Sequence, residues 1–92
     1  MDNKRRKRIR EVLKLLREGK PDWSYIEAEL EDIRFEEEER HESMPESMED
    51  SETYRIQEES IDLLIEALDN IDPEDMDSSK FVIEALEQID GI

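Results

Sequence analysis

The stretch WSYIEAELEDIRFEEEERHE, residues 23–42, predicts a long amphipathic helix from which the rest of the fold can be built. Its apolar residues recur at intervals of three and four, so they share one face of the helix. They form a coiled-coil-like seam of Trp23, Ile26, Leu30 and Ile33. We therefore expect residues 23–42 to pack along another helix.

A second apolar stripe lies on nearly the opposite side of the same helix and consists of Tyr25, Ala28 and Phe35. A helix that is apolar on two faces is usually packed between neighbours, and we expect that arrangement here. The helix should begin near Asp22 or Ser24, because Ser24 and Glu27 have the spacing of a capping box.

Three further segments, residues 4–18, 50–71 and 78–90, also have helical periodicity. In order along the chain, their main apolar sets are Ile9, Val12, Leu13 and Leu16; Tyr54, Ile61, Leu64, Leu68 and Ile71; and the run from Phe81 to Ile89. Gly19 and Pro21 end the first helix. The last helix starts either at Asp72, with Pro73 in the first turn, or later, at Asp77 or Ser78.

These patterns predict an all-α fold in which residues 1–92 form one domain. Residues 23–42 and 50–71 would make an antiparallel helical hairpin, with the N- and C-terminal helices packed on it. A chain of 92 residues buries little apolar surface, so we expect a homodimeric, coiled-coil-like bundle. Residues 1–5 should fray, because cations at a helix N-terminus oppose the helix dipole.

Charge is divided unevenly along the chain, whose formal net charge is −16. Residues 1–20 hold nine basic and three acidic residues, a net of +6, whereas residues 21–92 hold four basic and twenty-six acidic residues, a net of −22. The acidic part should repel nucleic acid and attract basic surfaces. The basic segment could pair with the acidic helices of its own chain or of a second protomer, or it could bind nucleic acid phosphates.

The stretch from Leu30 to Tyr54, followed by IDLLIEALDNID, resembles a group of small acidic helical proteins of Gram-positive phages, prophages and mobile elements. The most distinctive element of the resemblance is the turn Ser43-Met44-Pro45-Glu46-Ser47. This chain departs from the group by inserting breaks at residues 19–22 and 72–73. The resemblance implies a mobile-element accessory protein and supplies no active site.

Catalytic signals are sparse, because the chain has no cysteine, one histidine and two glycines. One metal motif is formally present: Glu36 and Glu39, then Glu59 and Asp62, resemble the paired acidic motifs with which all-helical nucleotide pyrophosphohydrolases hold Mg²⁺. Because acidic residues are so frequent here, we expect these four carboxylates to be solvated, and we expect no metal, no cofactor and no enzymatic activity.

The density of carboxylates suggests a non-enzymatic protein-binding function instead. A row of acids on a helix can imitate nucleic acid and fill a basic nucleic-acid-binding cleft of a host defence protein, such as a CRISPR nuclease. The expected contact residues are Glu31, Glu36, Glu37, Glu38, Glu39 and Glu42. The alternatives are a structural coiled-coil adaptor and the Mg²⁺-dependent hydrolase. The chain has no apolar run of about 18 residues, so we expect no membrane contact. Together with this, the resemblance implies a protein of the cytoplasm of a bacterial host cell.

Overall fold

The computed structural model describes residues 2–19, 21–49, 51–72, 74–75 and 78–92. These ranges contain α1 (Asn3–Arg17), α2 (Trp23–Glu42), a 3-10 turn η1 (Glu46–Met48), α3 (Glu52–Asp69) and α4 (Ser78–Gly91). Within them there is no β-strand. The expectation of an all-α fold is therefore confirmed.

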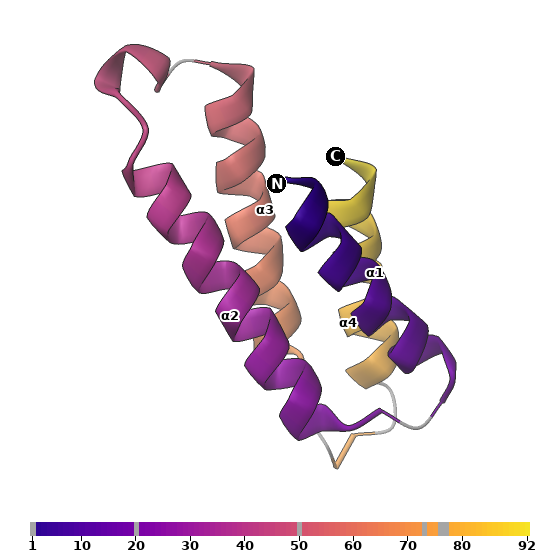
Figure 1. Ribbon diagram of the computed structural model, residues 1–92. Helices are drawn as coiled ribbons and strands as arrows, with labels where there is room; N and C mark the ends of the chain where they lie inside the picture. Colours follow the sequence, from indigo (N-terminus) through magenta and orange to yellow (C-terminus); the bar gives the residue numbers. More distant parts are fainter. Residues whose placement is uncertain (1, 20, 50, 73, 76–77) are drawn as a thin grey trace.

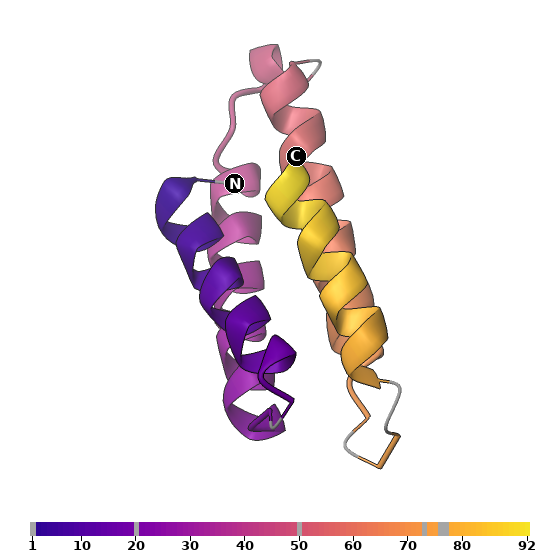
Figure 2. The same cartoon turned by 90° about the vertical axis from the view of Figure 1, so that its right-hand side faces the viewer.

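The helices form a small bundle with extents of 44 × 20 × 18 Å. Helix α3 packs against both α2 and α4, and α4 also packs against α1, whereas α1 and α2 approach each other closely at few places (Figure 1). In both views the end formed by η1 and the adjoining ends of α2 and α3 projects beyond the start of α1 and the end of α4 (Figures 1 and 2).

One hydrophobic core runs through the bundle and draws on every α-helix. From α1 and α2 it contains Ile9, Val12, Leu13, Leu16, Ile26, Leu30 and Ile33; from α3 and α4 it contains Leu63, Leu64, Ala67, Val82, Ala85, Leu86 and Ile89. The seam predicted for residues 23–33 is thus a core face, with Trp23 half-buried at its margin. Polar side chains are also buried, namely Arg5, Glu37, Gln57, Ser60 and Ser78.

The second apolar stripe of α2 is not covered by any part of the chain that the structure describes. Tyr25 is 49% exposed, Phe35 is 59% exposed and Ala28 is also exposed, so the prediction that α2 is packed on two opposite faces is wrong for this chain. Helices α1 and α3 flank the face that carries Ile26 and Leu30, which leaves the opposite face to solvent.

Aspartate and serine side chains set the beginnings of three helices. Asp22 caps α2 by accepting from the Tyr25 N–H at 3.2 Å, so the Ser24 capping box does not form the start. Asp2 caps α1 in the same way, at 2.8 Å from the Arg5 nitrogen, and α1 is helical from Asn3, where we had expected fraying. Ser51 caps α3; the expected start at residue 50 lies outside the described residues.

The connection before α4 is closed by Ser78, which is buried and begins that helix. Its hydroxyl donates to the Asp72 carbonyl at 2.6 Å and accepts from the Asp72 N–H at 3.1 Å. The earlier helix start proposed at Asp72 is therefore not used, and the roles proposed for Pro73 and Asp77 fall on residues outside the described ranges. The seam predicted for residues 50–71 is only partly buried: Leu64 is buried, whereas Tyr54, Ile61 and Leu68 of α3, and Ile71 just after it, are half-buried.

The two faces of α2 predict opposite effects of truncating neighbouring side chains. Ile33→Ala should lower the free energy of unfolding by about 2–5 kcal/mol, because it empties a fully buried core site. Phe35→Ala should change it by about 0.5 kcal/mol or less, because the ring is largely exposed. Urea unfolding of the two variants measures both values; a large loss for Phe35→Ala would mean that a second chain covers this face.

Candidate functional site

All five arginines of α1 have partners within the chain. Arg5 and Arg8 reach acidic residues of α2, whereas Arg6, Arg10 and Arg17 reach α4. The lysines of the same helix, Lys4, Lys7 and Lys14, are exposed, and none of them has an ion pair to a described residue. The basic segment therefore binds the acidic helix of its own chain, one of the alternatives that the sequence left open.

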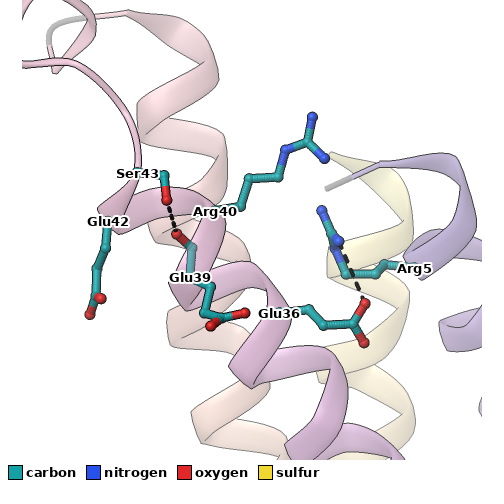
Figure 3. Close-up of a pocket in the computed structure, with 6 residues that line it drawn as sticks. All are labelled: Arg5, Glu36, Glu39, Arg40, Glu42 and Ser43. Atoms are coloured by element: carbon teal, nitrogen blue, oxygen red, sulfur yellow. Dashed lines mark hydrogen bonds and ion pairs between the residues drawn. The ribbon is translucent and has the colours of Figure 1, made fainter.

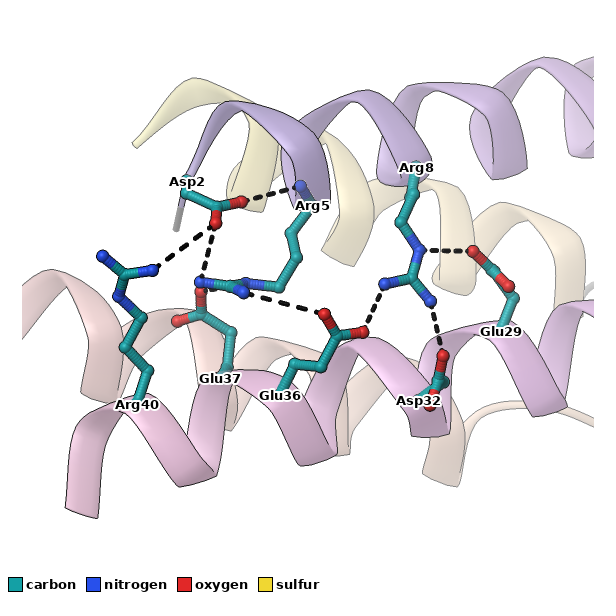
Figure 4. Close-up of polar contacts among 8 residues, drawn as sticks. All are labelled: Asp2, Arg5, Arg8, Glu29, Asp32, Glu36, Glu37 and Arg40. Atoms are coloured by element: carbon teal, nitrogen blue, oxygen red, sulfur yellow. Dashed lines mark hydrogen bonds and ion pairs between the residues drawn. The ribbon is translucent and has the colours of Figure 1, made fainter. Parts of the chain in front are cut away.

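Arg8 is the centre of the ionic contact between α1 and α2 (Figure 4). Its Nε donates to Glu29 at 2.6 Å, its Nη2 donates to Asp32 at 2.8 Å, and its Nη1 bonds to Glu36. The hydrogen bond to Glu29, reinforced by those to Glu36 and Asp32, raises the pKa of the Arg8 guanidinium further above its usual range. One guanidinium thus holds three carboxylates spaced three and four residues apart on one side of α2.

Arg5 and Glu37 form a buried ion pair at the next turn. Arg5 Nε donates to Glu37 Oε1 at 2.9 Å; Arg5 is 7% exposed and Glu37 is 0% exposed. The same guanidinium lies 3.2 Å from Asp2 and 3.8 Å from Glu36. A buried carboxylate is costly unless it is paired, so this position of α2 depends on α1 being docked.

Asp2 links the beginning of α1 to this cluster. The hydrogen bond from the Arg5 N–H lowers the pKa of Asp2, and the nearby charges of Arg5 and Arg40 act in the same direction, against the opposing effect of burial. Arg40 of α2 lies 3.7 Å from the Asp2 carboxylate. The cap of α1 is thereby tied to α2.

The other arginines attach α1 to the end of α4. Arg6 donates to the carbonyls of Asp90 and, at 2.9 Å, of Ile92, while Arg10 binds the Asp90 carboxylate at 2.8 Å. Arg17 pairs with Glu87 at 3.2 Å. Arginine suits these sites because its planar fork can bond to several oxygens at once, which lysine cannot do in the same way.

The expected contact residues fall into three groups: one is buried, two are paired with arginines and three are exposed. Glu37 is buried and cannot contact a partner on the outside of the folded chain, so its assignment to the contact set is corrected. Glu36 is half-buried against Arg8, and Glu38 pairs with Arg34 at 2.9 Å. Glu31, Glu39 and Glu42 are exposed, without an ion pair to any residue in the described ranges.

A second acidic row, on α3, escaped the sequence-based selection. It consists of Glu58, Asp62, Glu66 and Asp69, all exposed. Their spacing of four, four and three residues places them along one side of the helix. This spacing can be read from the sequence, but the run of carboxylates at residues 36–39 is denser and gives the stronger signal.

An open hollow of about 820 Å³ lies where the start of α1 meets the end of α2. Its lining consists of Arg5, Glu36, Glu39, Arg40, Glu42 and Ser43 (Figure 3). The side chains of Arg40 and Glu42 point to different sides, and the Ser43 hydroxyl donates to the Glu39 carbonyl at 2.8 Å. The lining groups therefore do not converge on one point as catalytic groups would.

The magnesium motif is not assembled in this fold. Across the described ranges, no three acidic or histidine side chains come together as a metal site, and Glu36 is bound to Arg8.

A transmembrane helix needs about 20 apolar residues, and none of the helices in the described part of the chain has such a run.

Comparisons with protein-family models, with curated proteins and with solved structures found no match to this chain.

The buried ion pair predicts a rescue by a second substitution. Arg5→Met should lower the free energy of unfolding by about 3–5 kcal/mol, because the Glu37 carboxylate stays buried without its guanidinium. Adding Glu37→Leu should recover most of that loss. Arg17→Met, which removes an exposed pair, serves as the control and should cost about 1 kcal/mol or less. A double variant no more stable than Arg5→Met would contradict this interpretation.

The lowered pKa of Asp2 predicts a stabilisation that disappears in acid. The contribution is complete above the ordinary value of 3.8 and is lost as the pH falls through the lower folded-state pKa. Asp2→Asn keeps a capping side chain but removes the charge. We expect it to be less stable than the parent by about 0.3–1 kcal/mol at pH 7, and equally stable in strong acid. Unfolding curves over a pH series test this, with Glu58→Gln as an exposed control.

Proposed function

We propose that this chain acts by binding a protein that has a basic nucleic-acid-binding surface, and that it occupies this surface in place of nucleic acid. The observation that carries the proposal is the division of its charges. The arginines of α1 are paired internally, whereas acidic rows remain on the outer sides of α2 and α3.

The spacing of these rows suits a phosphate-binding cleft. The row from Glu58 to Asp69 on α3 places a carboxylate about every 5–6 Å along the helix axis, at 1.5 Å per residue. On α2, Glu31, Glu39 and Glu42 extend over about 16 Å. One strand of DNA carries a charge about every 3.4 Å, so each row resembles a line of phosphates at a lower density.

The mechanism would be steric and electrostatic competition. A cleft lined by lysine and arginine attracts the acidic rows over a distance that shrinks as salt increases. The folded bundle then fills space that nucleic acid would otherwise occupy. The resemblance to phage and mobile-element proteins favours a host defence enzyme as the target, such as a CRISPR nuclease, and an action in the bacterial cytoplasm.

A homodimer is compatible with this proposal only if its interface lies elsewhere. Two copies that met through α2 or α3 would oppose like charges, at a net charge of −16 per chain. The α4 side offers Phe81, which is 48% exposed, as an apolar contact. We therefore place a second copy, if one binds, on the side away from the acidic rows.

Reversing charges on the outer face should abolish binding without unfolding the chain. The variant Glu39→Lys with Glu42→Lys should no longer capture nucleic-acid-binding proteins from a bacterial lysate at low salt, while its circular dichroism remains helical. The parent chain should release those proteins when salt or duplex DNA is added, since both compete with electrostatic binding.

A matched control reverses the same number of charges outside the acidic rows. Glu18→Lys with Glu84→Lys changes exposed residues of the α1–α2 connection and of α4, and it should bind as the parent does. If both variants lost binding equally, net charge and not the acidic rows would explain the loss. Capture that resists high salt, and is lost only with core seam variants, would instead favour the structural adaptor.

A further inference from the structure

Phe35 is the most exposed large hydrophobic side chain in the described part of the chain, at 59%. It lies in the middle of the outer face of α2 and borders a hollow of about 180 Å³ that is also lined by Glu31, Arg34 and Glu38. Glu31 precedes it by four residues and Glu38 follows it by three, so both carboxylates stand one turn away on the same side.

Neither packing in the core nor contact with a second copy explains the exposed Phe35 ring. Phe35 faces away from the buried seam of α2, and its rim carries more carboxylates than cations. A symmetric contact through this face would bring the acids of two copies together. The chemistry of the rim therefore favours a cationic partner.

The chain itself shows how α2 holds a cation. On the side that faces α1, Glu29, Asp32 and Glu36 follow each other at intervals of three and four and share the guanidinium of Arg8. On the outer side, Glu31, Phe35 and Glu38 follow at intervals of four and three. The outer set thus has the same one-turn spacing, with an aromatic ring in the central position.

We propose that this outer set binds an arginine of the basic partner, stacked on the Phe35 ring between Glu31 and Glu38. The inference rests on the proposed function and names the contact that adds specificity to it. A guanidinium is favoured over an ammonium because it stacks on an aromatic ring and still bonds to carboxylates with its edges.

Arg34, which lies beside this site, does not prevent the contact. Arg34 donates to Glu38 at 2.9 Å within the same helix, and both side chains are more than a third exposed. Pairs of this kind are weak and exchange easily. An arginine of the partner can therefore replace Arg34 at Glu38. Glu31 has no ion pair to any described residue, so it can bind the same arginine.

The test uses the full chain and two helical peptides that differ only in carrying arginine or lysine at positions one turn apart. Binding at low salt is followed by nuclear magnetic resonance of the isotope-labelled chain. We expect the arginine peptide to bind more tightly and to shift signals around Phe35. Phe35→Ala should weaken it about tenfold, whereas the exposed control Phe81→Ala should leave the affinity unchanged. Arg34→Gln should tighten binding, because it removes the competitor for Glu38.

Several results would overturn the inference. Equal effects of Phe35→Ala and Phe81→Ala would do so, as would signal shifts confined to other helices. Sedimentation that showed a dimer dissociated by Phe35→Ala would assign the face to a second copy. If Phe35→Ala leaves binding unchanged while charge reversal at Glu39 and Glu42 abolishes capture from lysate, the arginine contact at Phe35 is ruled out and the proposed function stands. If neither change affects binding, the contact and the proposed function are both ruled out.

Discussion

The fold depends on an ion pair buried between α1 and α2. Glu37 continues the seam of Ile26, Leu30 and Ile33 at the spacing that should place another apolar residue in the core. The chain puts a carboxylate there, and a carboxylate without water must be paired. Arg5 meets this need, and the contact holds the first turn of α1 beside Glu37. The cap at Asp2 and the cluster around Arg8 tie the same side of α1 to α2.

Helical periodicity predicted the all-helical class and the buried seam of α2, because both depend on local spacing. It could not decide which of two apolar stripes on α2 would be covered, since that depends on where α1 and α3 lie. Nor could it separate Asp22 from Ser24 as the cap, because both are good capping residues two positions apart. Periodicity also misplaced the buried face of α3. Gln57 and Ser60 are buried although they are polar, and a pattern of apolar residues cannot predict this.

The acidic run at residues 36–39 shows more clearly what sequence periodicity cannot predict. Glu36, Glu37, Glu38 and Glu39 are identical in the sequence, yet one is buried, two are paired at the margins and one faces solvent. A turn of 100° per residue accounts for the difference. Extending the three-four spacing from Ile33 would have assigned Glu37 to the core. The need for a nearby arginine could then have been inferred from composition alone.

The segregation of the two basic residue types has a practical consequence for handling the molecule. The arginines of α1 form ion pairs or hydrogen bonds with α2 or with the end of α4, and the chain's lysines all lie outside the ranges of α2 and α3 in the sequence. Amine-reactive dyes, biotin or a sensor surface would therefore react with lysines outside the acidic rows, and the described lysines, Lys4, Lys7, Lys14 and Lys80, are all exposed. A chain immobilised through these lysines would leave the carboxylates of α2 and α3 unmodified.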